Sequence, residues 1–84
     1  MNVEISEAAK RDIRRLDKPV ARRVIMRLSW FADNIDDLIP MPMKGKWSGF
    51  FKLRIGDYRV LYEIIENENL IFVIQVGHRR EIYR

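Results

Sequence analysis

Hydrophobic and polar positions follow two different periods along the chain, and the change falls near residue 50. Up to residue 34, apolar residues recur every three or four positions, which is typical of amphipathic helices. From residue 50 onwards they alternate with polar residues, as in half-buried strands. Val3 and Ile5 alternate in the same way near the start. The pattern therefore predicts one strand, two helices and then three strands.

The two predicted helices lie between residues 6 and 34. Ser6 is a candidate N-cap, and Glu7 in the first turn suits the helix dipole. Asp17 is expected to end the first helix, after Leu16, and to cap the second. Pro19 would lie in the first turn of the second helix, where its missing N–H costs little. The apolar positions expected to face the core are Ala9, Ile13, Leu16, Val20, Val24, Ile25, Leu28, Trp30 and Phe31.

Residues 35–49 contain two prolines and two glycines and are predicted to form a loop. The predicted strands that follow are 50–55, 58–66 and 70–78. "GD" at 56–57 and "NEN" at 67–69 have the composition of hairpin turns.

At 84 residues, the chain is long enough for one modest core, so residues 1–84 are expected to be a single domain. The predicted fold class is α+β. A short N-terminal strand is followed by a two-helix hairpin, which packs on one face of a mainly antiparallel four-stranded sheet.

Strict alternation assigns the sheet residues to two faces. The helix-covered face would hold Phe51, Leu53, Ile55, Val60, Tyr62, Ile64, Phe72, Ile74 and Val76. The open face would hold Lys52, Arg54, Arg59, Leu61, Glu63, Val73, Gln75, Gly77 and Arg79. Four cations against one carboxylate indicate a basic surface for phosphates, although a merely solvated face is the alternative. Leu61 and Val73 beside these cations suggest that a partner covers the face.

The amino-acid composition limits the kinds of site and partner that the chain can have. The chain has no cysteine and one histidine, which excludes a thiolate metal site and makes a zinc or iron centre unexpected. No apolar stretch approaches the ~20 residues that span a bilayer, and no secretory leader is visible. We therefore expect a cytoplasmic domain without a metal, a cofactor or a membrane partner. The net charge of +4 suits a nucleic acid or an acidic protein.

Two blocks of sequence resemble a known family. "WSGFFKLRIGDYRVLYEI" at 47–64 and "VIQVGHRREIYR" at 73–84 are similar to the RelE/ParE superfamily of toxins from type II toxin–antitoxin pairs. The resemblance implies the microbial ribonuclease-like α+β fold. In the RelE branch it also implies a metal-independent endoribonuclease, an mRNA interferase that cuts mRNA in the ribosomal A site and inhibits translation.

The family's catalytic residues carry over onto Lys52, Arg59, Arg79 and Tyr83. The first of the family's two strand lysines is replaced by Phe50, for which Arg54 on the same face can compensate. The resemblance implies that Arg59 and Arg79 hold phosphate oxygens and that Lys52 stabilises the 2′-oxyanion or acts as a base. Tyr83 would stack on a base or relay a proton. Further RNA contacts are expected from Arg54, Arg80 and Arg84.

His78 is a candidate general acid or base, because histidine is the side-chain type that changes charge near neutral pH. Alternation places it on the helix side with Val76, whereas Arg79 faces the open side. A bulge at Gly77 would turn it towards the cations. A catalytic and a structural role therefore both remain open for His78.

The resemblance implies three partners: mRNA, the ribosome and an acidic, RelB-like antitoxin through which oligomers form. The antitoxin is expected to cover the region of Lys52, Arg59 and the 79–84 tail, with apolar footing on Leu61 and Val73. Two alternatives remain: a ParE-like toxin that inhibits DNA gyrase without cutting RNA, and an inactive antitoxin-bound or RNA-binding homologue. Phe50 favours the alternatives, whereas the "VGHRREIYR" ending favours the RelE branch.

Overall fold

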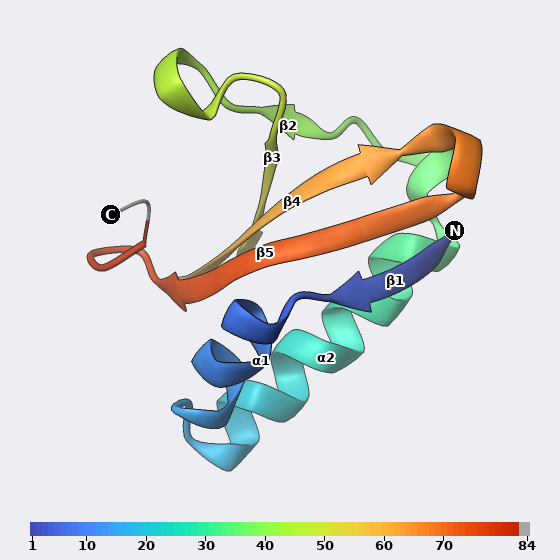
Figure 1. Cartoon of the computed structure of the whole chain (residues 1–84). Coiled ribbons are helices and arrows are strands. Elements are labelled where there is room, and N and C mark those ends of the chain that lie inside the picture. Colours follow the sequence, from blue (N-terminus) through green and yellow to red (C-terminus); the bar gives the residue numbers. More distant parts are fainter. Residues whose placement is uncertain (83–84) are drawn as a thin grey trace.

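Two helices lie on one face of a five-stranded sheet in the computed structural model of this chain, which describes residues 1–82 (Figure 1). The helices are α1 (Glu7–Arg14) and α2 (Lys18–Asp33). The strands are β1 (Asn2–Ile5), β2 (Met41–Pro42), β3 (Phe51–Ile55), β4 (Tyr58–Ile65) and β5 (Leu70–His78). Three short 3₁₀ helices lie in the connections: η1 (Ile35–Asp37), η2 (Gly45–Trp47) and η3 (Glu66–Glu68). The predicted α+β class is confirmed.

The helix boundaries follow the predicted caps closely. The Ser6 hydroxyl accepts a hydrogen bond from the Ala9 N–H at 3.1 Å, so Ser6 is the N-cap of α1. Asp17 precedes α2 but makes no side-chain cap bond. The core face of α2 is narrower than predicted, because Ile25 and Trp30 are each 43% exposed, whereas Val24, Leu28 and Phe31 are buried.

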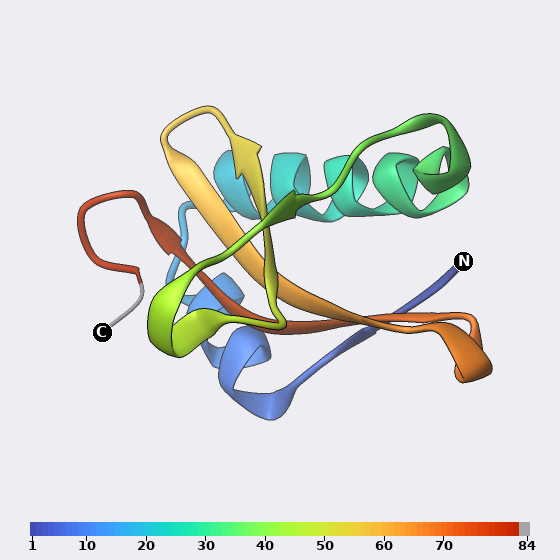
Figure 2. The ribbon, with the colours of Figure 1, turned by 90° about the horizontal axis from the view of Figure 1, so that it is seen from above.

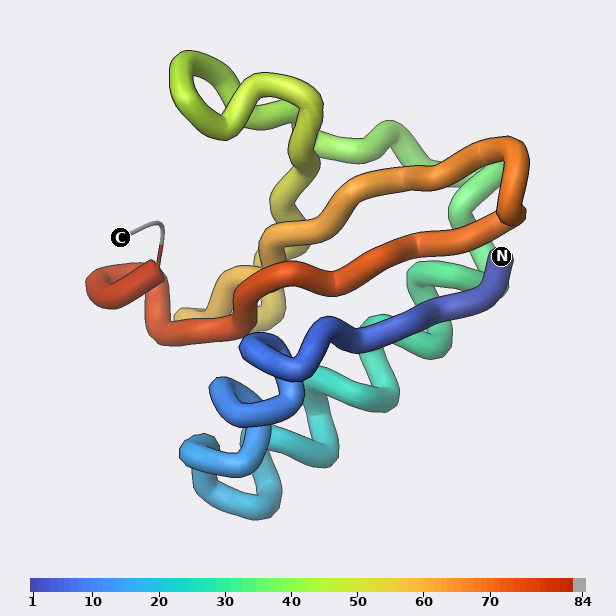
Figure 3. Tube along the Cα trace, in the orientation of Figure 1, coloured from blue at the N-terminus to red at the C-terminus, as the bar shows by residue number. Residues whose placement is uncertain are grey.

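The strands are ordered β1-β5-β4-β3-β2. β1 runs parallel to β5, and its residues lie beside 70–73 (Figure 3); the other neighbours are antiparallel. The fifth strand, β2, comes from the predicted loop and pairs Met41 with Lys52. Seen from above, the sheet is strongly twisted (Figure 2).

The β3–β4 hairpin turns at Gly56 and Asp57. Gly56 has a φ of +58°, and Asp57 is not among the residues with positive φ, which is the pattern of a type II′ turn. A Cβ at Gly56 would lie 2.9 Å from Nη2 of Arg23 on α2, the movable end of a flexible side chain, so it is the positive φ that favours glycine here.

A β-bulge in β5 changes the predicted facing of its first half. Leu61 pairs with Gln75 but Tyr62 pairs with Val73, so Ile74 is the extra residue. Val73 joins Ile71 in the core beneath the helices. The prediction was therefore wrong for Val73, which does not face the open side, and also for Phe72 and Ile74, which are not core residues.

The edge of β5 beyond β1 is satisfied by the start of α1. The Ser6 N–H donates to the Val73 carbonyl at 2.9 Å, and the Ser6 hydroxyl donates to the Ile74 carbonyl at 3.2 Å. Asp12 Oδ2 accepts from the Val76 N–H at 3.0 Å. β1 ends at Ile5, opposite Val73, and makes no ladder bonds to the rest of β5. The bonds from Ser6 and Asp12 take their place, so the backbone around the bulge keeps its hydrogen-bond partners.

Tyr62 lies at the centre of the core. Its ring stacks on Phe51 with centroids 5.7 Å apart and meets Phe31 edge-on at 5.4 Å. The side chain is fully buried, and its hydroxyl makes no hydrogen bond. Burial raises the pKa of Tyr62 to about 12, because the phenolate would lose its hydration.

We predict that Tyr62→Phe stabilises the fold by about 1 kcal/mol, because it removes an unsatisfied buried hydroxyl. Above pH 10 the unfolded chain loses the Tyr62 proton, whereas the folded chain holds it to about pH 12. The free energy of unfolding should therefore fall by roughly 1.4 kcal/mol per pH unit across that window, and this component should be absent in Tyr62→Phe. Urea titrations at pH 8 to 12 measure both effects.

Tyr58→Phe is the matched control, since Tyr58 is half-buried at the start of the same strand. The free energy of unfolding of Tyr58→Phe should still fall above pH 10, as that of the wild-type chain does. A Tyr62→Phe chain that is less stable than wild type at pH 8 would contradict the expected effect of removing the hydroxyl.

Candidate functional site

Two arginines face each other at the hairpin end of the open face. The β3–β4 register places Arg54 directly opposite Arg59. Like charges in such a pair destabilise a sheet, because their Cβ atoms lie only about 5 Å apart. Arg54 is exposed, and neither arginine belongs to the two ion pairs described, Lys10–Glu7 and Arg79–Asp57. The pair therefore holds positive charge available to an anion.

The turn fixes the side chain of Arg59. Its Nη1 donates to the carbonyls of Gly56 at 2.8 Å and Tyr58 at 2.9 Å. Both bonds come from one nitrogen, which leaves Nε and Nη2 for another acceptor. Backbone carbonyls orient the guanidinium without neutralising it.

The same turn positions Arg79, which follows the end of β5. The Arg79 N–H donates to the Asp57 carbonyl at 2.8 Å. The Arg79 Nε lies 3.9 Å from Asp57 Oδ1, but these side chains are 52% and 67% exposed, so their ion pair is weak. The structure thus gathers Arg54, Arg59 and Arg79 around residues 56–57; we call these three residues the arginine cluster.

Lys52 lies on the same face, two residues before Arg54 along β3. It is half-buried and pairs with Leu61. Position 50 supplies no charge: the Phe50 ring meets Trp47 edge-on with centroids 6.0 Å apart. The open face thus carries the arginine cluster at one end and Lys52 beside it.

His78 lies on the other face of the sheet. It pairs with Tyr58, and the two rings meet edge-on at 5.5 Å. Both residues line a pocket of about 350 Å³ together with Asp12 and Arg15 of the helical hairpin. The bulge lies at Ile74 and not at Gly77, so His78 keeps its helix-side position. The idea that His78 joins the cations is wrong for this structure.

His78 instead organises the turn that follows β5. Its Nδ1 accepts from the Arg80 N–H at 3.2 Å, and its carbonyl accepts from the N–H groups of Glu81 and Ile82 at 2.8 and 3.1 Å. A Cβ on Gly77 would lie 3.7 Å from the Ile82 Cβ, so the turn folds back over Gly77 on the open face. Arg80 is exposed. Tyr83 and Arg84 lie outside the described residues.

Leu61 and Val73 do not provide the expected apolar footing. Both are fully buried, and Val73 lies under the helices. The anchoring role of Gly56 and Asp57 was not predicted, because its signal in the sequence is the turn dipeptide alone. Within residues 1–82, no cluster of three histidine or carboxylate side chains is arranged to bind a metal. No helix in this range is long and apolar enough to cross a membrane.

The chain belongs to the family described as the ParE toxin of type II toxin–antitoxin systems, parDE, whose model matches residues 3–83. This match spans nearly the whole chain, and the resemblance to the RelE/ParE superfamily is confirmed. The protein is therefore the toxin of a type II toxin–antitoxin pair.

Two individual relatives carry the names RelG and RelE. The chain is 27% identical over 82 residues to Toxin RelG of Mycobacterium tuberculosis, covering 98% of this chain and 94% of the relative. It is 28% identical over 83 residues to Toxin RelE of the same organism, covering 99% and 86%. The fold matches a chain of the toxin–antitoxin complex RelBE2, also from M. tuberculosis, with a TM-score of 0.82 at 24% identity, covering 93% of this chain and 96% of that one.

We predict that Asp57→Asn strengthens binding of a 12-nucleotide single-stranded RNA by roughly two- to fivefold at low salt. The change removes the carboxylate beside the arginine cluster while keeping the backbone carbonyl that positions Arg79. Fluorescence anisotropy at several salt concentrations measures the affinity.

Glu68→Gln is the control, because it removes one negative charge in η3, at the far end of β4 from the cluster. An equal gain in both variants would mean that net charge alone, and not the arginine cluster, governs binding.

Proposed function

We propose that this toxin is a ribosome-dependent mRNA interferase. The 2′-oxygen of one nucleotide attacks the adjacent phosphorus, and the bond from phosphorus to the 5′-oxygen breaks. The 2′-hydroxyl loses its proton and the leaving 5′-oxygen gains one. The products are a 2′,3′-cyclic phosphate and a 5′-hydroxyl, so the RNA supplies its own nucleophile.

The arginine cluster is the observation that carries the proposal. Two arginines face each other on β3 and β4 at a cost in sheet stability, and a third is held at the same turn. The pentacoordinate transition state carries more negative charge than the ground-state phosphate. Preorganised donors around that charge are the largest contribution to many phosphoryl transfers.

The proposed roles follow from side-chain chemistry and position. Arg59 and Arg79 bind the non-bridging oxygens, since planar guanidinium groups suit paired acceptors. Lys52, beside the cluster, stabilises the developing 2′-oxyanion. Tyr83 stacks on a base or relays a proton, a role that rests on the family resemblance alone.

The remaining candidates assist without touching the reacting atoms. Arg54, Arg80 and Arg84 contact the RNA backbone. His78 is proposed as a positioning residue, because its Nδ1 and its carbonyl hold the turn that follows Arg79.

The proposed dependence on the ribosome follows from the poor ability of these side chains to accept a proton. Arginine stays protonated at every physiological pH and is no ordinary base. An active site built from cations therefore holds charge well but depends on RNA that is already close to the in-line geometry. The decoding site of the ribosome is the proposed source of that geometry.

The proposed partner that neutralises the toxin is an acidic, RelB-like antitoxin, through which oligomers form. Two observations support this partner: the RelBE2 match is a toxin–antitoxin complex, and this chain carries a net charge of +4. A flexible acidic segment can wrap a basic surface and order on binding.

We predict that Arg79→Ala and Arg59→Ala each lower cleavage of ribosome-bound mRNA by about 10²- to 10³-fold, because each removes a donor to the developing charge. Arg79→Ala should leave thermal stability almost unchanged. Arg59→Ala should cost slightly more, since it loses two bonds to the turn. Mapping of mRNA 5′ ends after induction measures cleavage in cells.

Arg14→Ala, which removes an exposed cation from α1, is the matched control and should cleave normally. Intact mRNA together with DNA damage after induction of the wild-type chain would instead support gyrase inhibition. That alternative is favoured by the ParE name of the family model and by Phe50.

We predict that His78→Gln lowers the ribosome-dependent rate without removing an ionisation from the rate profile between pH 6 and 9. Loss of a positioning bond weakens the turn but takes no proton carrier from the reaction. The measurement is single-turnover cleavage on programmed ribosomes, with naked RNA of the same sequence in parallel. Loss of an ionisation would make His78 catalytic, and rapid cleavage of naked RNA would contradict the ribosome requirement.

A further inference from the structure

Two aromatic rings lie at the end of β3 that is opposite the arginine cluster. The Met43 N–H donates to the Phe50 carbonyl at 2.9 Å, so the pairing of β2 with β3 continues to Phe50. Phe50 therefore keeps the alternation of β3 and faces the same side as Lys52 and Arg54. Trp47, the last residue of η2, meets the Phe50 ring edge-on with centroids 6.0 Å apart. We call Trp47 and Phe50 the aromatic pair.

The aromatic pair is partly packed against the sheet and partly open to solvent. Leu61 pairs with Lys52, so Phe50 is the diagonal neighbour of Leu61 on the open face, within the reach of an aromatic side chain. Leu61 is fully buried although it does not belong to the core beneath the helices, so other side chains on the open face cover it. Trp47 and Phe50 are each half-buried. Both rings are thus held by the protein while part of each stays accessible to a ligand.

The segment that carries the aromatic pair is positively charged throughout. Residues 38–56 contain no aspartate or glutamate and four cations: Lys44, Lys46, Lys52 and Arg54. Lys44 and Lys46 are exposed, and the Lys46 Nζ lies 5.8 Å from the centroid of the Trp47 ring. Figure 1 shows η2 on the side of the sheet away from the helices, as is the turn that follows β5. Aromatic rings among cations are the combination with which proteins bind single-stranded nucleic acids.

The spacing along β3 fits a strand of RNA that is already held at the arginine cluster. Phe50 precedes Lys52 by two residues and Arg54 by four, which correspond to roughly 7 and 13 Å along a strand. A single strand with one phosphate in the cluster therefore reaches the aromatic pair within about two to four nucleotides, depending on how far it is extended. The aromatic pair thus lies on a path that the proposed substrate can follow.

We propose that the aromatic pair stacks on one base of the mRNA, a few nucleotides from the phosphate that lies in the arginine cluster. This inference rests on the proposed function and adds a base contact to a site whose described residues otherwise bind phosphate. Phosphate contacts position a strand, whereas base contacts distinguish sequences. Purines have a larger π-face than pyrimidines, so a purine at this nucleotide binds more tightly. Trp47 and Phe50 thereby give the site a sequence preference that its cations do not supply.

The test compares two probes that both carry phosphates, of which only one carries bases: a 12-nucleotide single-stranded RNA and inorganic polyphosphate. Phe50→Leu and Trp47→Leu each lose an aromatic face but keep an apolar side chain. Binding of the RNA should weaken at least about fivefold in each variant. Binding of polyphosphate, measured by competition, should stay within about twofold of wild type, because the cations are unchanged.

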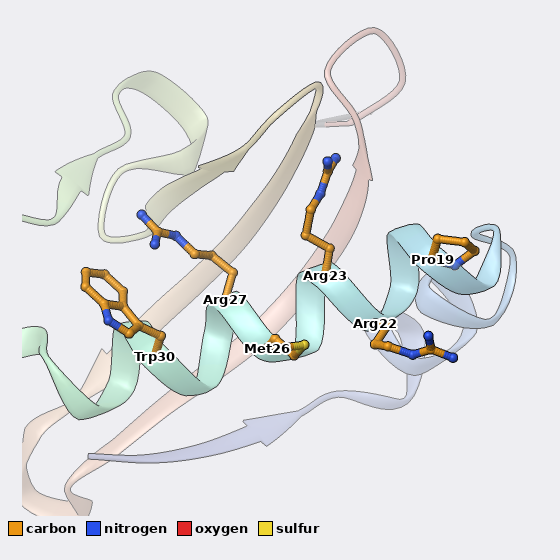
Figure 4. Close-up of a pocket in the computed structure, with 6 residues that line it drawn as sticks. All are labelled: Pro19, Arg22, Arg23, Met26, Arg27 and Trp30. Atoms are coloured by element: carbon orange, nitrogen blue, oxygen red, sulfur yellow. The ribbon is translucent and has the colours of Figure 1, made fainter.

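Trp30→Leu is the matched control. The Arg27 guanidinium carbon lies 4.3 Å from the Trp30 ring centroid, so α2 also presents a tryptophan beside a cation (Figure 4). Trp30→Leu should bind both probes as the wild-type chain does. Tryptophan emission gives a second readout, because the chain has two tryptophans. The RNA should quench Trp47 in the Trp30→Leu chain and should leave the emission of Trp30 in the Trp47→Leu chain unchanged.

Two results would overturn the proposal. Binding of RNA and of polyphosphate that weakens to the same degree in Phe50→Leu and Trp47→Leu would mean that the rings only support the fold of the cationic surface. Binding of RNA that both variants retain would mean that no base stacks on the aromatic pair.

Cleavage of ribosome-bound mRNA separates this inference from the proposed function. Cuts made by the wild-type chain should show an excess of purines at one fixed position within about four nucleotides of the cut, and Phe50→Leu should lose this excess. A wild-type chain whose Trp47 stacks on RNA but which leaves mRNA intact would refute the interferase proposal and leave the base contact supported. Cleavage by Phe50→Leu with the wild-type preference and the wild-type RNA affinity would refute the base contact and leave the interferase proposal supported.

Discussion

One extra residue in β5, Ile74, determines the facing of both halves of the strand. Upstream of it, Ile71 and Val73 point beneath the helices; downstream, Val76 does so. The bulge is held because the Ser6 hydroxyl and the Asp12 carboxylate satisfy the backbone on either side of it. With Val73 buried and no bulge, the parity would be reversed beyond it, and Arg79 would be directed under the helices. The open-face position of the arginine cluster therefore depends on two side chains near the start of the chain.

Most of the fold could be predicted because its elements have strong local signals. Ser6, Pro19 and the change of period near residue 50 fix the boundaries of helices and strands to within about two residues. The facing of Phe72, Val73 and Ile74 could not be predicted, because a bulge arises from tertiary hydrogen bonds that leave no period in the sequence. Trp30 was misassigned for a related reason: the sequence alone does not distinguish an apolar residue on an exposed helix face from one in the core.

The candidate site could likewise be predicted only in part. The alternation of cations with apolar residues predicted which of Lys52, Arg54 and Arg59 share a face, and the β3–β4 register agrees. The turn at residues 56–57 was predicted, but the hydrogen bonds by which its carbonyls hold two of the arginines could not be, since carbonyls have no side-chain signature. Cationic side chains thus contribute charge, and the backbone of residues 56–58 contributes much of the geometry. The arrangement of the arginine cluster therefore depends on Gly56, whose carbonyl orients Arg59 and whose positive φ shapes the turn.

The strand order has a consequence for the timing of synthesis. β5 lies between β1 and β4, yet it is the last of the five strands along the chain, and Asn2 pairs with Leu70. While the ribosome makes this chain, both helices and four strands emerge before the strand that joins the two parts of the sheet. Until then the core lacks Ile71, Val73 and Val76, and no Arg79 stands beside the hairpin turn. Long-range pairing also makes closure of the sheet slow relative to helix formation. The nascent chain consequently cannot complete the sheet or gather the arginine cluster until nearly all of its residues have been made.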